Sequence, residues 1–335
     1  MLKASIDKLG IAFENYFTQM NYTKMIVQKI ERTKKIFFWA IALMLLSNFT
    51  YAQSKNDTLR IFLIGNSFSQ NASAYLPEMA KEKGKHLIIG RAELGGHSLE
   101  QHWKYVEAAE ANPESAEGRP YKGKSLRTLL SEGKWDMITL QQASYLSADK
   151  ESYTPYAQKL YDFVKSIQPK AEVVLHQTWA YRADAKTFGR VAAGQLAQNQ
   201  AEMWQKSREA YHAAAKQLKV RIIPVGDAFE EVATGKEYAY QKDTAFDFTN
   251  PTYPNLPNQV NSLNMGYSWK NNKEFTFDAN HANEAGRYLG GLIWYSFLFK
   301  DSPENIQFVP NKVPADFAKY LRKVAAQTLK NSNKK

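Results

Sequence analysis

Leu59-Arg-Ile-Phe-Leu-Ile-Gly-Asn-Ser-Phe-Ser69 is a short, mostly apolar run that breaks at a Gly-Asn-Ser turn. Its first part, residues 59–64, has the length and the Ile and Phe content of a buried β-strand. The glycine and asparagine that follow mark a tight turn. We therefore expect Ser67 to emerge at the carboxyl end of a strand, at the boundary with the next element.

Short apolar segments alternate with amphipathic ones along the rest of the chain. Continuous apolar strands separated by helices are typical of a parallel sheet that is covered on both faces. The sequence therefore predicts an α/β fold, a three-layer α/β/α sandwich around a mostly parallel five-stranded sheet of the flavodoxin-like kind. The strands are expected at 59–64, 86–91, 136–140, 171–177 and 220–225. The main helices are expected near 72–83, 98–111, 153–167, 197–218 and 283–299.

The composition fits one large domain. The chain has 335 residues, 44% of them hydrophobic, which is enough for one α/β domain with a substantial core. It contains no Cys, which excludes disulfides, thiolate metal sites and a cysteine nucleophile. The net charge of +11 is scattered, without a basic stripe, so no nucleic-acid partner is expected. We expect the domain at 53–310, after an extension at 1–52 and before a C-terminal helix and basic tail at 311–335.

The N-terminal extension has the pattern of a secretory signal peptide with a long prefix. A basic segment at 29–35 precedes an apolar run at 36–46 and the small-residue pattern Thr50-Tyr-Ala52. The apolar run is shorter than a bilayer span. We expect a start at Met25 or Met20, cleavage near Ala52, and a secreted or periplasmic protein without a stable membrane partner. The alternative is an uncleaved membrane anchor.

A second informative motif, Asp278-Ala-Asn-His281, comes more than two hundred residues after Ser67. It places a carboxylate and an imidazole three residues apart, just before a helical pattern begins at Asn283. A serine hydroxyl becomes a good nucleophile when a base takes its proton, and that base needs a partner that fixes its tautomer. The conjunction predicts a serine hydrolase. Taken singly, a turn glycine and a hydrogen-bonded histidine at a helix start have ordinary structural explanations.

Three segments of the chain resemble the SGNH/GDSL-type serine hydrolases. Gly65-Asn-Ser67 is similar to block I of that superfamily, usually Gly-Asp-Ser, and Gly95-Gly-His-Ser98 is similar to block II. Asp278-x-x-His281 is similar to block V, which carries the acid and the base. The resemblance covers about residues 57–300 and points to a secreted bacterial branch with Gly-Asn-Ser in block I. It implies the SGNH fold and a reaction that needs no cofactor or metal ion.

The resemblance also implies a role for each of these residues. Ser67 is expected to attack the substrate, with His281 as the base and Asp278 as the residue that orients His281. The backbone N–H groups of Ser67 and Gly96 are expected to form the oxyanion hole.

The sequence departs from the family pattern at two of the blocks. Asn66 stands where block I usually has Asp, a change expected to alter the hydrogen bonds of the turn while keeping the nucleophile. Block III of the family supplies an asparagine to the oxyanion hole, whereas this chain has Leu140-Gln-Gln-Ala-Ser144. Because a glutamine amide can also donate a hydrogen bond, Gln142 or Gln141 is the expected substitute.

The exit of the fourth expected strand supplies most of the candidate substrate contacts. Trp179 and Tyr181 are expected to stack on a sugar ring as part of a pocket wall, with hydrogen bonds from His176 or Gln177. The alternative is a core tryptophan beside a buried, hydrogen-bonded histidine. The expected substrate-binding residues are Asn66, His97, His176, Gln177, Trp179 and Tyr181.

Residues 235–277 break the alternation of strands and helices, because they are rich in Tyr, Asn and Pro and show no clean period. A long aromatic segment of this kind is more often functional than disordered, so we expect a lid or substrate wall. The resulting hypothesis is a secreted serine esterase that acts on a small-molecule or oligosaccharide ester, with deacetylation of a carbohydrate as the first choice. The alternatives are a non-catalytic glycan-binding protein on the same scaffold and a lipase or lysophospholipase.

Overall fold

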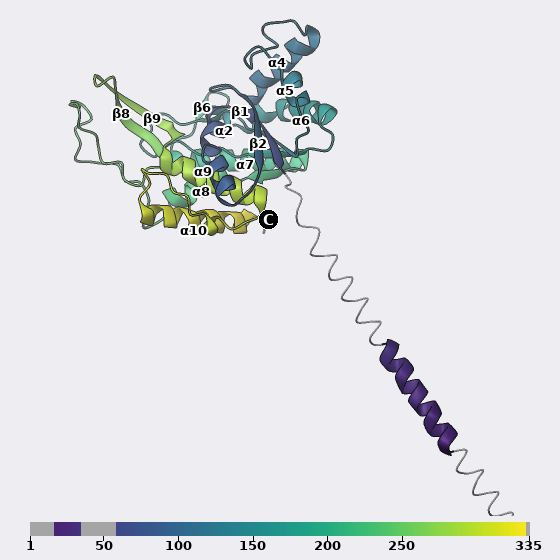
Figure 1. Ribbon diagram of the computed structural model, residues 1–335. Helices are drawn as coiled ribbons and strands as arrows, with labels where there is room; N and C mark the ends of the chain where they lie inside the picture. The colour runs from purple at the N-terminus through teal and green to yellow at the C-terminus, as the bar shows by residue number, and fades with distance from the viewer. Residues whose placement is uncertain (1–16, 35–57, 333–335) are drawn as a thin grey trace, which may run out of the picture. The chain divides into compact units, whose positions relative to one another are not determined.

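The computed structural model describes residues 17–34 and 58–332 (Figure 1). The chain separates into two compact units, Met1–Asp57 and Thr58–Lys335. Within the first unit, residues 17–34 form a helix. None of the helices in the two described ranges is long and apolar enough to cross a membrane.

The predicted signal peptide falls mostly outside the described residues. Its apolar run at 36–46 and the cleavage site near Ala52 both belong to the part of the chain that the structure does not describe. Secretion is therefore still a prediction from the sequence.

The second unit contains a five-stranded parallel sheet with the strand order β2-β1-β3-β4-β7. Its strands are β1 (Leu59–Gly65), β2 (Leu87–Glu93), β3 (Met137–Leu140), β4 (Glu172–His176) and β7 (Arg221–Ile223). This order corresponds to the flavodoxin-like arrangement, in which ligands bind beyond the carboxyl ends of the strands, where the order reverses. In this chain that point lies between β1 and β3.

Helices cover both faces of the sheet, so the predicted α/β/α sandwich is confirmed. Alternate β1 side chains point to opposite faces: Ile61 and Leu63 enter one core, and Phe62 and Ile64 enter the other. The first core is covered by α2 (Ser67–Ala72), α3 (Leu76–Glu82), α8 (Val225–Ala233), α9 (Glu284–Phe299) and α10 (Ala315–Ser332). The second core is covered by α4 (Leu99–Ala111), α5 (Leu126–Ser131), α6 (Tyr156–Ile167) and α7 (Gln200–Leu218).

The helix expected at 72–83 corresponds to the shorter α3, and the additional short helix α2 precedes it. Pro77 lies in the first turn of α3, where its missing N–H costs nothing. Further inside a continuous helix the same ring would clash with the carbonyl group four residues earlier. The break allows α2 to begin directly at Ser67, immediately after the strand.

The segment at 235–277, for which no regular structure was expected, ends in an antiparallel hairpin of β8 (Asn264–Lys270) and β9 (Glu274–Ala282). The hairpin projects from the sandwich in Figure 1. Aromatic side chains pair across it, with Tyr267 stacked on Phe277 at a ring-centroid distance of 4.2 Å. Cross-strand pairs of this kind stabilise a two-stranded hairpin. The remaining short elements are β5 (Arg190–Ala192), β6 (Gln195–Leu196), η1 (Ser144–Leu146), η2 (Lys150–Tyr153) and η3 (Pro303–Asn305).

Candidate active site

The turn after β1 holds Ser67 as the first residue of α2. The Asn66 side chain caps this helix, because its Oδ1 accepts a hydrogen bond from the Phe68 N–H at 3.0 Å. The Asn66 N–H donates to Gln141 Oε1, also at 3.0 Å. Gly65 is required for space, since a Cβ atom there would lie 2.6 Å from the same Gln141 oxygen. The turn therefore fixes the Ser67 backbone and leaves its half-buried side chain at the sheet edge.

Ser67, His281 and Asp278 meet in one hydrogen-bonded chain. Ser67 Oγ lies 2.9 Å from His281 Nε2, and His281 Nδ1 lies 2.8 Å from Asp278 Oδ2. The other Asp278 oxygen accepts the backbone N–H groups of Asn280 and His281, at 3.1 and 3.0 Å. A carboxylate at Nδ1 favours the tautomer whose Nε2 can accept the serine proton.

The electrostatics of Asp278 agree with this arrangement. Burial raises the pKa of its carboxyl, but the hydrogen bonds from the His281 side chain and backbone and the attraction to the imidazole outweigh burial. The net pKa lies below its usual value. Asp278 is therefore ionised at neutral pH and can stabilise a protonated imidazole.

Four hydrogen bonds hold the end of β9, which carries His281. The Ala279 carbonyl accepts the Arg182 N–H at 2.9 Å and Asn264 Nδ2 at 2.8 Å. Trp179 Nε1 donates to the Asn280 carbonyl at 2.8 Å, and the N–H that follows His281 donates to the Asn71 side chain on α2 at 2.9 Å. Because α2 also carries Ser67, the last bond fixes the positions of His281 and Ser67 relative to each other.

Two backbone N–H groups are available for an oxyanion. Ser67 is the first residue of a helix, and the first N–H groups of a helix have no partner within it. Gly96 is exposed, with φ at +72°, and a Cβ there would meet no atom within 4 Å. This glycine is needed for its left-handed backbone and not for space. The Asn66 Nδ2 donates to the His97 carbonyl at 2.9 Å, which ties the Gly96 loop to the nucleophile turn.

Neither glutamine expected in the oxyanion hole points toward Ser67, which corrects that prediction. Both side chains are 0% exposed. Gln141 Oε1 accepts from Asn66 and Ser69, and its amide nitrogen donates to the Gln142 carbonyl. Gln142 Nε2 donates to the backbone and side-chain oxygens of Ser152, at 3.0 Å each. Both amides are committed to the scaffold behind the site.

Four of the expected substrate contacts also belong to this scaffold. Trp179 is fully buried between Phe68 and Phe229, with ring-centroid distances of 4.3 and 4.5 Å. Gln177 is buried and exchanges hydrogen bonds with Asp227 through both ends of its amide. The other two are His176 and Asn66, buried behind and within the nucleophile turn. The predicted substrate role is wrong for these residues, because none can reach a ligand in solvent.

Two buried histidines near the ends of β1 and β4 are neutral at pH 7. Burial lowers the pKa of His176 to about 3, and its Nδ1 lies 3.3 Å from Ser69 Oγ. Burial also lowers the pKa of His102 to about 4. His102 Nε2 lies 2.9 Å from the Gly65 carbonyl and Nδ1 lies 2.6 Å from the Tyr121 hydroxyl. A neutral imidazole satisfies both His102 contacts if Nε2 donates and Nδ1 accepts.

The other two expected contacts, His97 and Tyr181, are partly exposed near the site. His97 is occupied by the Gly95 carbonyl and the Tyr105 hydroxyl, each at 2.9 Å. Tyr181 lines a cavity of about 520 Å³ that also includes Asn280, the neighbour of the base. A larger hollow of about 870 Å³ is lined mainly by residues of α7, α8 and α10. Neither hollow is lined by Ser67, His281 or Asp278, but only the smaller one includes a residue from the segment between Asp278 and His281.

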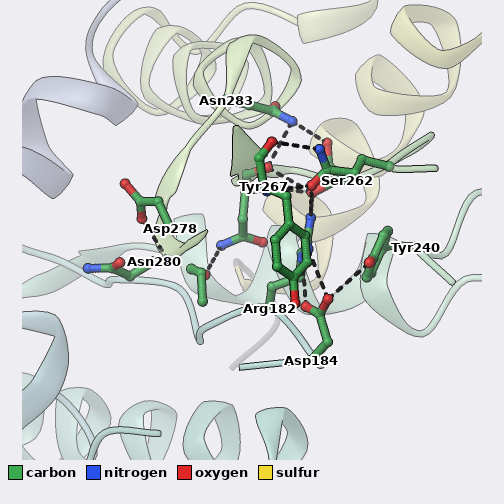
Figure 2. A network of polar contacts seen from close by, with 11 residues as sticks. Arg182, Asp184, Tyr240, Ser262, Tyr267, Asp278, Asn280 and Asn283 are labelled. Atoms are coloured by element: carbon green, nitrogen blue, oxygen red, sulfur yellow. Dashed lines mark hydrogen bonds and ion pairs between the residues drawn. The ribbon is translucent and has the colours of Figure 1, made fainter. Parts of the chain in front are cut away.

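Arg182 is a central residue that the sequence analysis missed (Figure 2). Its side chain is 2% exposed and forms a bidentate ion pair with Asp184, at 2.7 and 2.9 Å. It also donates to Gln259 and Ser262, at 2.9 and 3.3 Å. The guanidinium carbon lies 4.9 Å from the Phe277 ring centroid. The Arg-x-Asp pair in the loop after β4 is the signal that the sequence offers for this residue.

The family model described as Domain of unknown function (DUF4886) matches residues 60–249, which is more than half of the chain. The chain therefore belongs to the DUF4886 family. A search of curated proteins found no match.

The chain is also similar to several solved structures. A DUF4886 family protein from Bacteroides uniformis is 25% identical, with a TM-score of 0.61, over 82% of this chain and 95% of that one. A protein from Slackia heliotrinireducens, provisionally described as an SGNH hydrolase, is 19% identical (TM-score 0.42; 72% and 98% covered). An acetyl xylan esterase from Geobacillus stearothermophilus is 11% identical (TM-score 0.39; 77% and 100% covered). The strand order and the helices on both faces agree with the predicted SGNH-type fold. Membership of the SGNH superfamily stays a prediction from the sequence motifs.

Proposed function

We propose that this protein is a serine ester hydrolase that works through an acyl-enzyme. The observation that carries the proposal is the hydrogen-bonded chain from Ser67 through His281 to Asp278, with contacts of 2.9 and 2.8 Å. Hydrogen-bond reach between nucleophile and base, with the base oriented by a third group, is the geometry that activates a serine.

In the first half of the reaction, Ser67 Oγ attacks the ester carbonyl while His281 Nε2 accepts the hydroxyl proton. Asp278 holds the imidazole and stabilises its positive charge. The N–H groups of Ser67 and Gly96 donate to the oxyanion of the tetrahedral intermediate. When the intermediate collapses, His281 returns the proton to the leaving alcohol, and the acyl group stays on Ser67.

In the second half, a water molecule attacks the acyl-enzyme and gives its proton to His281. The second tetrahedral intermediate is held by the same donors. Collapse releases the carboxylic acid, and the proton returns from His281 to Ser67. At the end of each half His281 is neutral again, so the reaction needs no other acid or base.

The substrate proposed first is an acetyl ester of a carbohydrate. Aromatic side chains line the cavity that includes Asn280, which suits the flat apolar face of a sugar ring. With the expected export, this supports an extracellular or periplasmic glycan over a cytoplasmic metabolite. A lipase function and a non-catalytic glycan-binding function are the alternatives that the experiment separates.

The test combines turnover with covalent labelling. We expect hydrolysis of 4-nitrophenyl acetate, and a fluorophosphonate adduct that peptide mass spectrometry locates on Ser67. Glycan binding with neither turnover nor labelling would identify a binding module and reject the proposal. Turnover that survives Ser67→Ala and is lost with a chelator would reject it in favour of a metal mechanism.

A further inference from the structure

The cavity beside the base is built from three segments that are distant in the sequence. The loop after β4 contributes Tyr181 and Lys186, the long loop before the hairpin contributes Phe248, and the hairpin contributes Phe275 and Phe277. Ala279 and Asn280 complete it between the acid and the base. Ser67, Asp278 and His281 do not line the cavity, so a ligand there lies beside the segment that joins Asp278 to His281.

The chemistry of the cavity wall is selective. Five of its side chains are aromatic, and its polar groups are two threonine hydroxyls, the Asn280 amide, tyrosine hydroxyls and the Lys186 ammonium group. None of the side chains that line this described cavity is Leu, Ile, Val or Met. Aromatic faces mixed with donors and acceptors suit a ring that carries hydroxyl groups, whereas an acyl chain favours an aliphatic wall.

The aromatic part of the wall is held rigidly from behind. The guanidinium carbon of Arg182 lies 4.9 Å from the Phe277 ring centroid and 5.4 Å from that of Tyr267. Tyr267 stacks in turn on Phe275, at 5.1 Å. Arg182 itself is 2% exposed and is ion-paired with Asp184, so it supports the rings without facing a ligand (Figure 2). A preformed surface loses little conformational entropy when a ligand binds.

We propose that this cavity is a subsite for one pyranose ring of an acetylated carbohydrate, next to the ester that Ser67 attacks. The inference rests on the proposed function, and it adds the site at which the enzyme would select a carbohydrate substrate. The hairpin then serves two purposes, since its end carries Asp278 and His281 and its aromatic face binds the sugar.

The test compares two substrates that differ in their need for the subsite. We measure the ratio of kcat/KM on O-acetylated xylotriose and mannotriose to kcat/KM on 4-nitrophenyl acetate. Phe275→Ala is expected to lower this ratio at least about tenfold, through loss of one aromatic contact. Because Phe275 also packs within the hairpin, the double variant Lys186→Ala/Thr187→Ala, at two exposed positions, provides an independent check.

The control is Tyr253→Ala, which removes an exposed aromatic ring that packs on Trp269 and does not line the cavity. It is expected to keep the ratio within about twofold, as surface substitutions generally do. If both subsite changes also keep the wild-type ratio, or if the wild type hydrolyses 4-nitrophenyl acetate but neither glycan, the subsite is overturned while the esterase stands. A selective loss on 4-nitrophenyl octanoate would overturn it in favour of an acyl-chain pocket.

A binding measurement separates the subsite from the proposed function. Saturation-transfer NMR on Ser67→Ala with the unacetylated trisaccharides is expected to show contacts that Ser67→Ala/Phe275→Ala loses. Contacts without esterase activity in the wild type would reject the reaction and keep the sugar site. Identical contacts in both variants would reject the subsite.

Discussion

Polar residues at the ends of the strands fall into two groups that differ in solvent exposure. Asp278 and His281, on the hairpin, have side chains 40% and 36% exposed, and they meet the half-buried Ser67 at the exit of β1. Gln142 and His176, at the exits of β3 and β4, are 0% exposed. Both groups occupy the sheet edge where ligands usually bind in such folds, yet only the first faces solvent.

The difference lies in how much hydrogen-bonding capacity is already used. Gln142 accepts from the N–H groups of Leu99 and Ala143 and donates to Ser152. Ser67 Oγ, in contrast, has a hydrogen bond only to His281 among the described residues. A polar group whose partners are all internal cannot turn toward a substrate without leaving another buried group unpaired, which is costly. The position at a strand exit is therefore a weaker guide to function than the available bonding capacity.

Replacing two neighbouring serines tests this comparison most strongly. Ser67→Ala should lower kcat on 4-nitrophenyl acetate by about 10⁴- to 10⁶-fold, because nothing else can attack the carbonyl. Its unfolding midpoint in urea should stay close to that of the wild type.

The matched change, Ser69→Ala, removes a buried hydroxyl that donates to Gln141 at 3.0 Å. It should cost about 1–3 kcal/mol in the free energy of unfolding, with most of kcat retained. An equal fall in kcat for the two variants would contradict the distinction between the solvent-facing residues and the buried ones.

The second test removes the cation behind the hairpin. Arg182→Ala leaves Asp184 buried without its charge partner, and this should lower the free energy of unfolding by about 3–5 kcal/mol. Urea unfolding provides the measurement. The control, Arg221→Ala, breaks an exposed bidentate pair with Glu172 and should cost about 0–1 kcal/mol. Similar losses in the free energy of unfolding for both variants would show that burial does not determine how much these ion pairs contribute to stability.

The third test asks whether Gln142 has a catalytic role after all. Gln142→Ala leaves the N–H of Leu99 without its partner, so a loss of about 1–3 kcal/mol in stability is expected. The fall in kcat should stay below about tenfold, whereas loss of an oxyanion-hole donor costs about 10²- to 10³-fold. Steady-state kinetics at a temperature where both proteins are folded distinguishes the two, and a 10²-fold fall would return Gln142 to the oxyanion hole.

The fourth test uses pH. The pKa of His102 is lowered to about 4 by burial, so below its ordinary pKa of 6.5 the unfolded chain binds a proton that the folded chain does not. The wild type is therefore expected to lose stability as pH falls. Between pH 7 and pH 5 this one group contributes about 2 kcal/mol of loss. His102→Gln should show a correspondingly smaller change, measured by urea unfolding at both values. Parallel pH profiles would mean that His102 is charged in the folded protein.

Much of the fold was predictable because short segments of the sequence determine its strands and turns. Apolar runs and turn residues located the five strands. The motifs Gly65-Asn-Ser67 and Asp278-x-x-His281 located the three residues that the structure joins by hydrogen bonds. The roles of Gln141 and Arg182 could not be predicted, because their partners are distant in the sequence. Gln141 bonds Asn66 across 75 residues, and Arg182 bonds Gln259 across 77. Such pairs exist only after the sheet has assembled, so no local pattern reports them.

The capping residue of the nucleophile turn also constrains how this sequence can change. Asn66 presents an amide nitrogen to the His97 carbonyl at 2.9 Å. An aspartate at this position, as in the usual Gly-Asp-Ser, would set a charged oxygen against that carbonyl. Reversion to the common motif would therefore require the Gly95–Ser98 loop to adopt another path at the same time. The two loops must diverge in concert, and a chimera that exchanges only one of them with an aspartate-bearing relative should be defective.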